Sequence, residues 1–490
     1  MKKTTIISLP NQKTERKRIN KTNVFEEFSL DDSYLSLGKD KLYYIYTYGC
    51  QENEADSEKI MGMLDMMSYK RTDDVEKADV IVMNTCAIRK NAEDKVFGEI
   101  GRLKPLKRKN PNLVTILCGC MSQEEVVVDT ILKKYQNIDI VVGTHNIHDI
   151  PDMLKQIYSG HTRIVNVLSH EGTIVESIPT IRESKIAAWV PIMYGCDEFC
   201  SYCIVPYTRG KERSRLPINI INEVKELANQ GYKQVTLLGQ NVNAYGKDFT
   251  DLKYDFADLL TDLHKIDIER IRFTTSNPKD FDSRQVDAMA LGGNIMPQLH
   301  LPVQSGSNKI LRAMARRYTR EKYLSLVKEI KEKIPNISLT TDIIVGFPGE
   351  TEEDFNETLS LVKEVGYEGA FTFIFSPREG TPAAKLTDPL ITDEVAHDRL
   401  YRLNELVNDG YLKGNMRFLN TIQDVLIEGV SKNNKDVLMG YNPNMKLVNV
   451  KGDKSLIGKI IKVKITDAKS WSLDGEAISD WKRKSINRLN

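Results

Sequence analysis

The chain has 490 residues, of which 41% are hydrophobic and 28% charged, and its formal net charge is +1. This composition is typical of a soluble globular protein with roughly two to four domains, and it excludes binding of nucleic acid through overall charge alone. No apolar run reaches the ~18–20 residues of a membrane span, and the N-terminus lacks a signal peptide's apolar core. We therefore expect a cytoplasmic protein with no membrane partner. In that reducing compartment, the seven cysteines are better explained as metal or redox ligands than as disulfides.

Positive charge gathers at the two ends of the chain. Residues 1–24 hold seven Lys and Arg against one acid, and residues 415–490 hold fourteen against eight Asp and Glu. Such an excess suits a polyanionic partner, although a solvated basic surface would give the same count. Residues 1–40 show no sustained periodicity, which predicts a basic, flexible extension.

Residues 41–160 alternate between apolar, β-branched runs and helical patterns. Strands are predicted at residues 41–48, 78–84, 113–117 and 139–142, with helices near 54–67, 91–107 and 124–135. This order is typical of a flavodoxin-like domain, in which helices cover both faces of a parallel sheet. Residues 161–183 lose the alternation and are predicted to be a linker.

A second alternation fills residues 184–412. Its six predicted strands lie at residues 187–194, 234–240, 270–276, 298–304, 338–347 and 369–376. Six successive strand–helix units predict a partial (β/α)6 barrel similar to a TIM barrel. Residues 415–482 show short strand patterns split by Gly, Asn and Asp, which predicts a small all-β, OB-like barrel. The whole chain is thus predicted to be an α/β multidomain protein.

Three cysteines, Cys196, Cys200 and Cys203, lie on one short loop after the first barrel strand, in the spacing CxxxCxxC. We call them the loop cysteines. Three thiolates can bind three irons of a cubane cluster, which leaves the fourth iron open to a small molecule. Structural zinc is a weaker explanation, because such sites need four ligands and no fourth Cys or His lies nearby. The loop also follows the carboxyl end of a strand, where barrel enzymes place their chemistry.

This spacing resembles the signature of the radical-SAM enzymes. The resemblance implies that the loop cysteines hold a catalytic [4Fe–4S] cluster whose open iron is chelated by S-adenosyl-L-methionine. It also implies cleavage of that cofactor to a 5′-deoxyadenosyl radical, which abstracts hydrogen from unactivated C–H bonds. Tyr202 would then lie beside the adenine, although packing the loop against the barrel is an equally available role.

Three further cysteines, Cys50, Cys86 and Cys120, each follow a predicted strand of the first domain and precede a helix. We call them the strand-end cysteines. The carboxyl ends of parallel strands share one edge of the sheet, so the topology brings these thiols together. A second cluster with an open iron is the favoured interpretation, and three buried structural cysteines are the alternative. Cys118 is predicted to be a core residue instead.

Two open clusters followed by a basic β-barrel resemble the methylthiotransferases, and the similarity covers about residues 42–480. It rests on the motifs NTCAIR, GCDEFCSYCIVPYTRG, LLGQNVNAYG, LHLPVQSGSNKIL, DIIVGFPGET and FSPREGTPA. The C-terminal barrel resembles the TRAM module, which binds RNA. Within the family, NTCAIRKNAEDKVFGEIGRLK, VPYTRG and GQNVNAY resemble the MiaB type most closely.

The MiaB-type resemblance implies methylthiolation of C2 of N6-isopentenyladenosine at tRNA position 37, with two S-adenosyl-L-methionine per turnover. It also implies two [4Fe–4S] clusters, the auxiliary one on the strand-end cysteines. The expected partners are a tRNA anticodon loop carrying isopentenyladenosine, an electron donor such as flavodoxin or ferredoxin, and an unknown sulfur donor, with the protein a monomer. The alternatives are a methylthiotransferase for threonylcarbamoyladenosine or a ribosomal-protein aspartate, and a non-catalytic RNA-binding iron–sulfur protein.

Polar side chains at the ends of the barrel strands are candidates for contact with the cofactor. They are Gln240, Asn241, Ser276, Asn277, Gln304, Ser305 and Asp342. Arg209, after the third loop cysteine, is a candidate for contact with a carboxylate or phosphate of the substrate. Ordinary loop or helix capping is an equally good explanation for each of these residues. His300, alone on its strand, is predicted to be structural.

Overall fold

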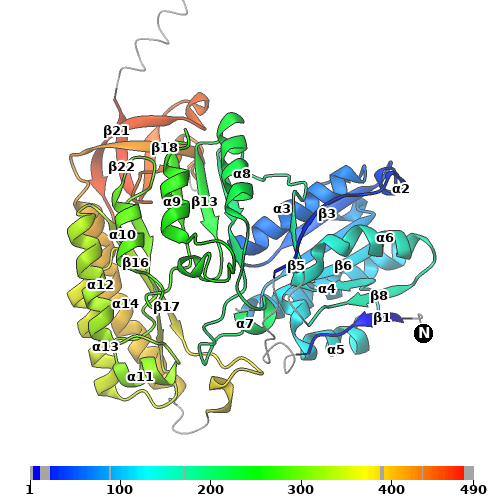
Figure 1. The fold of residues 1–490 in the computed structure, drawn as a ribbon, viewed down its shortest axis with the longest axis horizontal. Coiled ribbons are helices and arrows are strands. Elements are labelled where there is room, and N and C mark those ends of the chain that lie inside the picture. Colours follow the sequence, from blue (N-terminus) through cyan, green and yellow to red (C-terminus); the bar gives the residue numbers. More distant parts are fainter. Residues whose placement is uncertain are drawn as a thin grey trace, which may run out of the picture.

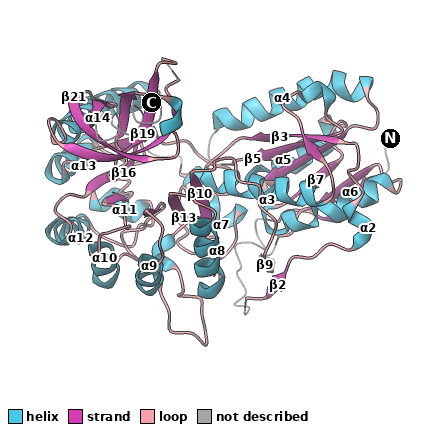
Figure 2. Cartoon of the chain, turned by 90° about the horizontal axis from the view of Figure 1, so that it is seen from above, coloured by secondary structure: helices cyan, strands magenta, loops and turns pink. Residues whose placement is uncertain are grey.

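The computed structural model of the chain describes residues 4–11, 23–87, 90–169, 173–386, 391–432 and 434–478. Two α/β domains lie side by side, and a small β-barrel covers one end of the middle domain (Figures 1 and 2). No helix in these ranges is long and apolar enough to cross a bilayer.

The N-terminal domain is built on a seven-stranded parallel sheet with the order β1-β8-β7-β6-β5-β3-β4. The four predicted strands are confirmed as β3 (Leu42–Thr47), β5 (Val80–Thr85), β6 (Val114–Gly119) and β7 (Ile140–Val142), and β4 (Lys70–Arg71) adds an edge. The helices are α3 (Gln51–Met66), α4 (Lys90–Lys109), α5 (Glu125–Lys134) and α6 (Ile150–Tyr158). Separate apolar clusters pack on the two faces of the sheet, as expected for a sheet covered on both sides.

The prediction of a flexible extension over residues 1–40 is wrong where the structure describes it. β1 (Thr4–Ser8) pairs with β8 (Arg163–Asn166) as an outer strand of the sheet, and β2 (Phe25–Glu27) pairs with β9 (Ile174–Glu176). The same pairings contradict a linker starting at residue 161, because β8 belongs to the sheet. These short strands are stabilised by partners about 150 residues away along the chain, so they leave little local pattern. The basic residues 12–22 lie outside the described ranges.

The middle domain confirms the partial barrel. Its six parallel strands are β10 (Ala187–Pro191), β13 (Gln234–Leu238), β14 (Arg270–Phe273), β15 (Gln298–His300), β16 (Ser338–Val345) and β17 (Ala370–Ile374). The outer helices include α8 (Pro217–Asn229), α9 (Phe256–His264), α10 (Ser283–Ala290), α12 (Arg320–Lys333), α13 (Glu352–Val365) and α14 (Asp393–Met416). Among the described residues no ladder joins β10 to β17, so the barrel is open on one side.

The C-terminal domain is a closed barrel with the order β18-β19-β20-β22-β21. Its strands are β18 (Ile422–Val430), β19 (Val437–Tyr441), β20 (Leu447–Lys451), β21 (Ile460–Ala468) and β22 (Leu473–Ala477). Arg270, the first residue of β14, donates to the backbone oxygens of Tyr441 and Asp424 at 2.8 and 2.7 Å. The small barrel therefore covers the amino ends of the middle-domain strands, opposite the end that carries the loop cysteines.

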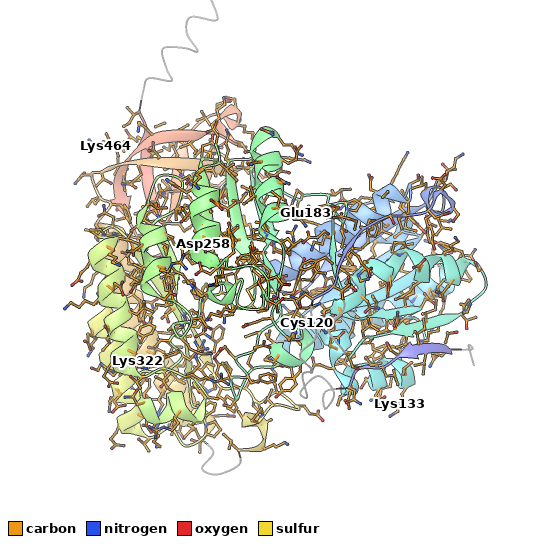
Figure 3. All side chains as sticks on the ribbon, viewed as in Figure 1. Cys120, Lys133, Glu183, Asp258, Lys322 and Lys464 are labelled. Carbon is orange, nitrogen blue, oxygen red and sulfur yellow. The ribbon has the colours of Figure 1, made fainter. Side chains whose placement is uncertain are left out.

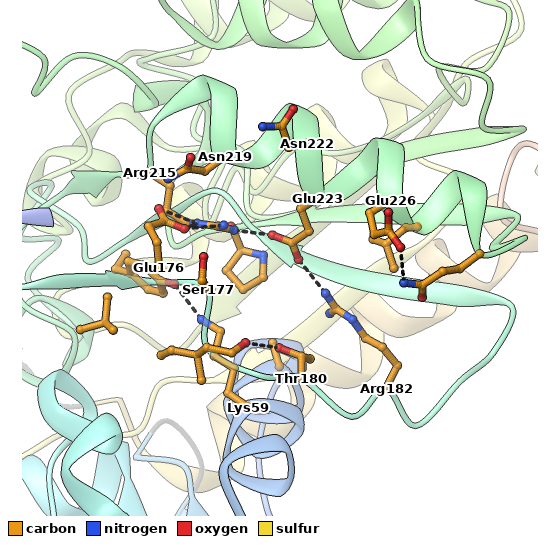
Figure 4. A pocket seen from close by; sticks show the side chains of 17 residues that line it. Lys59, Glu176, Ser177, Thr180, Arg182, Arg215, Asn219, Asn222, Glu223 and Glu226 are labelled. Atoms are coloured by element: carbon orange, nitrogen blue, oxygen red, sulfur yellow. Dashed lines mark hydrogen bonds and ion pairs between the residues drawn. The ribbon is translucent and has the colours of Figure 1, made fainter. Parts of the chain in front are cut away.

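Buried ion pairs hold the two α/β domains in contact. Arg182 pairs with Glu58 of α3 at 3.1 Å and with Glu223 of α8 at 2.6 Å. Arg215 pairs with Glu223 at 2.8 Å and with Glu176 of β9 at 2.7 Å. A cavity of about 440 Å³ between the domains is lined by residues that include Arg182, Arg215, Glu176 and Glu223 (Figure 4). The network fixes how the two domains face each other.

Candidate functional site

The loop cysteines follow β11 (Met193–Tyr194), which pairs with β12 (Arg213–Ser214). Gly195 has φ +76°, and a Cβ there would lie 2.0 Å from the backbone oxygen of Lys211, so only glycine fits. The Gln240 side-chain oxygen accepts a hydrogen bond from the Gly195 amide at 2.5 Å. The loop is thus fixed in shape before any ligand binds.

The three loop thiols influence one another electrostatically. Burial raises the pKa of Cys203 to about 12, and the neighbouring Cys200 thiol adds to that effect. Burial, Glu212 and the other two thiols raise the pKa of Cys196 well above its usual value. Arg316 donates from Nη1 to the Cys200 sulfur at 3.3 Å. Without metal the Cys196 and Cys203 thiols stay protonated, so iron binding must release protons.

The strand-end cysteines converge as predicted, because β3, β5 and β6 are neighbours in the sheet. A hydrogen bond with the Cys86 thiol lowers the pKa of Cys50 to about 5, and the charge of Arg209 contributes further. Burial raises the pKa of Cys120, while Arg209 opposes that rise. Cys118 is buried in an apolar cluster and points its sulfur at the Met83 carbonyl oxygen at 3.6 Å, which confirms its core role.

Arg209 does not face solvent, contrary to the expectation that it contacts the substrate. It is only 5% exposed. Its Nε donates to the Cys120 sulfur at 3.2 Å and its Nη1 pairs with Asp56 of α3 at 2.8 Å. The fold encloses the guanidinium between the two α/β domains, so in this structure an RNA phosphate cannot reach it.

The two cysteine groups adjoin one small apolar cluster, which includes Cys120 and Ile204, the residue after Cys203. Cys120 and Ala87 of the N-terminal domain pack there against Ile204 and Tyr207, which follow the loop cysteines, with Phe199 at the edge. Figure 3 places Cys120 where the two α/β domains meet. Both groups therefore face the same junction between domains.

Two of the predicted cofactor contacts, Gln240 and Asn241, also support the loop. Asn241 donates from its amide to Asp280 at 2.7 Å and to Glu212 at 3.3 Å, and Glu212 accepts from the Asp197 backbone amide at 3.2 Å. Asn241 nevertheless leaves its side-chain oxygen without a hydrogen-bond partner among the described residues. The Ser276 hydroxyl is also buried and unpaired in this part of the chain. Both atoms keep hydrogen-bonding capacity, and their contact with a bound cofactor stays a prediction.

The remaining polar candidates have local structural partners. The backbone amide of Asn277 donates to the Asn243 side chain at 2.9 Å. Ser305 is fully buried and lies 3.3 Å from the Thr358 hydroxyl. Gln304 has φ +71°, and its backbone amide donates to the Asp342 carbonyl oxygen at 2.9 Å. Their contact with the cofactor stays a prediction.

The inner wall of the open barrel is aromatic and exposed at β17. Phe371 is 59% and Phe373 43% exposed. The residue between them, Thr372, donates to Asn404 of the outer helix α14 at 2.6 Å, so the two rings point to the inner face. The His300 ring lies 5.9 Å from the Phe371 ring, centroid to centroid.

This wall runs from His300 toward the loop cysteines. Asp342 is next to Phe371 across the β16–β17 pair and lies 3.4 Å from the His300 Nε2. Nearer the carboxyl ends of the strands, Ile344 and Phe375 pack in one apolar cluster with Tyr202. An apolar surface therefore leads from the open side of the barrel to the cysteine loop.

The donor chemistry at both cysteine groups fits iron–sulfur clusters. Each group offers three sulfurs and one arginine that donates to a sulfur. No three Cys, His, Asp or Glu side chains in the described ranges gather as ligands of one metal ion. A cubane differs from a single ion because each thiolate binds its own iron, so the sulfurs stand further apart.

Sequence reasoning missed four charged residues of the site. They are Glu52, Asp56, Glu212 and Arg316, all set by folding beside a cysteine. Glu52 and Asp56 lie on the buried face of α3 just after Cys50, where carboxylates are rarely buried without a partner. Their burial could have been inferred from the helical period, but the partner Arg209 could not.

Three family descriptions match the chain in order. Residues 42–143 match the Uncharacterized protein family UPF0004, residues 190–362 the Radical SAM superfamily, and residues 417–478 the TRAM domain. These ranges correspond to the three domains of the fold.

Curated relatives match nearly the whole chain. A tRNA-2-methylthio-N(6)-dimethylallyladenosine synthase of Anoxybacillus flavithermus is 56% identical over 97% of this chain and 90% of its own length. The enzyme of that name from Bacillus subtilis is 55% identical over 96% of this chain and 92% of its own. Among solved structures, the radical S-adenosylmethionine methyltransferase TsrM from Kitasatospora setae has a TM-score of 0.51 at 13% identity, covering 70% of this chain and 76% of that one. The last similarity concerns the fold alone.

Proposed function

The chain belongs to the family of tRNA-2-methylthio-N(6)-dimethylallyladenosine synthases, and from this we propose that it methylthiolates C2 of N6-isopentenyladenosine at position 37 of tRNA. As a radical-SAM enzyme it uses S-adenosyl-L-methionine and an iron–sulfur cluster, which supply the one-electron chemistry that an unactivated purine carbon requires. We assign that cluster to the loop cysteines and a second, auxiliary cluster to the strand-end cysteines.

The observation that carries this proposal is the placement of both cysteine groups around one junction. Methyl, sulfur and radical chemistry must meet at one carbon, and the fold brings the two groups to the same apolar cluster. The ion pairs of Arg182 and Arg215 hold the domains in that arrangement. The protein therefore contributes by positioning the two cysteine groups and the base, so that reactants which would otherwise have to meet by diffusion are held together.

The aromatic inner wall supports isopentenyladenosine as the base. Phe371 and Phe373 offer exposed rings on which a splayed-out purine can stack and against which an isopentenyl group can be buried. A threonylcarbamoyl group carries a carboxylate, which would lie close to the Asp342 carboxylate on this wall, and His300, the nearby side chain that could pair with it, already lies 3.4 Å from Asp342. An anticodon-loop base is single-stranded and can enter the open side without breaking a duplex.

The C-terminal barrel supplies affinity and not chemistry in this proposal. It lies at the amino ends of the middle-domain strands, whereas the cysteines lie at the carboxyl ends. The middle-domain strands are three to eight residues long, and eight residues span roughly 26 Å. A tRNA held by the barrel would therefore extend along the middle domain to reach the cysteines. We further propose that the enzyme acts as a monomer in the cytoplasm and takes electrons from a flavodoxin or ferredoxin.

The test compares tRNA nucleosides by mass spectrometry in cells that lack this protein. Isopentenyladenosine should accumulate and its 2-methylthio derivative should disappear. Wild-type protein should restore the derivative, whereas alanine variants of either cysteine group should not. Anaerobically reconstituted wild type should bind about eight irons, and each triple variant about half of that. If the alanine variant of the strand-end cysteines still produced methylthiolated tRNA, those cysteines would have only a structural role.

A further inference from the structure

We propose that Arg209 is a positioning residue for the auxiliary cluster: it crosses from the middle domain to the strand-end cysteines and sets the reduction potential of the cluster they hold. This inference rests on the proposed function, since it requires a cluster on those cysteines. Arg209 is thus assigned a role at the strand-end cysteines of the N-terminal domain, and not at the substrate.

The geometry places Arg209 as a bridge between domains. It ends the short helix α7 (Val205–Thr208), and its backbone amide donates to the Val205 carbonyl oxygen at 2.8 Å, which fixes the start of the side chain. Nε then donates to the Cys120 sulfur at 3.2 Å, and Nη1 pairs with Asp56 at 2.8 Å. A movement of the domains would therefore change the surroundings of Cys120.

The guanidinium retains an unused donor at this position. Nη2 of Arg209 is buried and has no hydrogen-bond partner among the described residues. Leaving a buried charged donor unpaired is unfavourable, because it has lost its hydrogen bonds to water, so a bound acceptor is expected. The sulfides and thiolates of a cluster are acceptors of this kind, and hydrogen bonds to them are one of the protein's means of tuning a cluster.

Charge gives the direction of the effect. A reduced cluster carries one more negative charge than its oxidised form, so a nearby buried cation stabilises the reduced form more and raises the potential. Asp56 opposes this effect in part, because its carboxylate lies against the same guanidinium. Removing the cation and removing the anion should shift the potential in opposite directions.

The loop cysteines provide a matched control within the same chain. Arg316 donates from Nη1 to the Cys200 sulfur at 3.3 Å and is held by the Tyr318 hydroxyl and the Pro302 carbonyl oxygen. Each cysteine group thus has its own arginine. Exchange of one arginine should affect one cluster only.

The experiment uses full-length protein that retains a single cluster. Alanine at the three loop cysteines leaves the strand-end cluster, and alanine at the three strand-end cysteines leaves the other. In the first background, Arg209→Gln should keep the iron and lower the midpoint potential in a titration followed by electron paramagnetic resonance. Arg209→Lys should restore much of the shift, and Asp56→Asn should raise the potential. Arg316→Gln should leave this midpoint unchanged.

Opposite shifts for Arg209→Gln and Asp56→Asn support the inference, because general damage to the fold would not reverse sign. Unchanged midpoints with intact iron would overturn it, as would an equal effect of Arg209→Gln on the loop cluster in the second background. Iron loss in Arg209→Gln that lysine does not rescue would also overturn it. Absence of iron from the first background with Arg209 intact would instead refute the two-cluster assignment in the proposed function.

Discussion

Burial and neighbouring groups give chemically identical cysteines different properties at the residue scale. Cys50 is exposed and its pKa is lowered to about 5 by Cys86 and Arg209, whereas the pKa of Cys203 is raised to about 12 by burial and Cys200. The two values bracket the physiological range. In metal-free protein, Cys50 should therefore be a reactive thiolate at neutral pH, whereas Cys203 should stay protonated.

The first prediction concerns alkylation of metal-free protein. Cys50 is already a thiolate above pH 5, so its rate with iodoacetamide should stay nearly constant between pH 6 and 8. The rate at Cys203 should be low and rise about tenfold per pH unit, because its thiolate fraction grows until pH approaches 12. Peptide mass spectrometry measures both rates in one sample. A tenfold rise per unit at Cys50 would contradict the lowered pKa.

Each glycine at positive φ has its own surroundings, and these decide what a substitution does. At Gly195 a Cβ would overlap the backbone of residues 210 and 211, which cannot move without shifting the loop cysteines. Gly231, after α8, also has a positive φ of +89° but nothing within 4 Å of a Cβ. Substitution at Gly231 would cause backbone strain alone, whereas substitution at Gly195 would cause both strain and steric overlap, so comparing the two separates these effects.

The second prediction uses that pair. Gly195→Ala should reduce bound iron to about half and abolish cleavage of S-adenosyl-L-methionine, because the loop can no longer hold its shape. Gly231→Ala should cost only the backbone strain, about 1–2 kcal/mol, and should keep full iron. Iron content and thermal unfolding of the two variants give the comparison. Full iron in Gly195→Ala would show that the loop tolerates rearrangement.

At the scale of single elements, β17 combines two roles through its alternation. Thr372 faces the helix α14, while Phe371 and Phe373 face the open barrel. Large apolar side chains are seldom exposed side by side without a ligand to cover them. The strand therefore closes the core on one face and presents two exposed rings to the open barrel on the other, where we propose that the base binds.

The third prediction tests that surface. Phe371→Ala and Phe373→Ala should lower kcat/KM for tRNA carrying isopentenyladenosine about 10- to 100-fold, the effect of losing ~1–3 kcal/mol of stacking. Iron content should be unchanged. Tyr401→Ala, on the exposed outer face of α14, is the matched aromatic control and should have little effect. An equal decrease in kcat/KM in all three variants would show that the inner wall is not part of the substrate site.

At the scale of the whole molecule, the C-terminal barrel and the loop cysteines lie at opposite ends of the middle domain, so the proposed function separates RNA affinity from chemistry. Deleting residues from about 415 onward would expose Arg270 and Arg272, which the C-terminal barrel buries. A truncated protein could therefore lose tRNA affinity either because the barrel is missing or because the middle domain is destabilised. Surface substitutions are the cleaner test, since Lys462 and Lys464 are exposed and alternate along β21 with the buried Val463 and Ile465. Figure 3 shows Lys464 on the outside of the barrel.

The fourth prediction concerns those lysines. Lys462→Glu with Lys464→Glu should weaken tRNA binding and reduce its salt dependence by a slope of about 0.7–0.9 for each lost phosphate contact. Cleavage of S-adenosyl-L-methionine should persist, because the cysteines lie at the other end of the domain. Lys322→Glu, an exposed lysine on α12, controls for charge alone. Unchanged affinity and slope in the double variant would exclude this face of the barrel.

The sequence by itself determined the domain order, the six barrel strands, both cysteine groups and the family. These features depend on local patterns. The period of apolar residues, the turn residues and the cysteine spacing can all be recognised in the sequence without the structure. It also predicted that the strand-end cysteines meet, because parallel topology alone brings the ends of β3, β5 and β6 to one edge.

Only the tertiary structure decided the partners of individual side chains. Arg209 was expected at the substrate and lies against Cys120, and residues 4–8 were expected to be flexible and form β1. In both cases the stabilising partner is far away in sequence, 89 residues for Arg209 and Cys120. A buried charge or a short outer strand is favourable only when that partner is present, and a single sequence records the residues but not the distances between them.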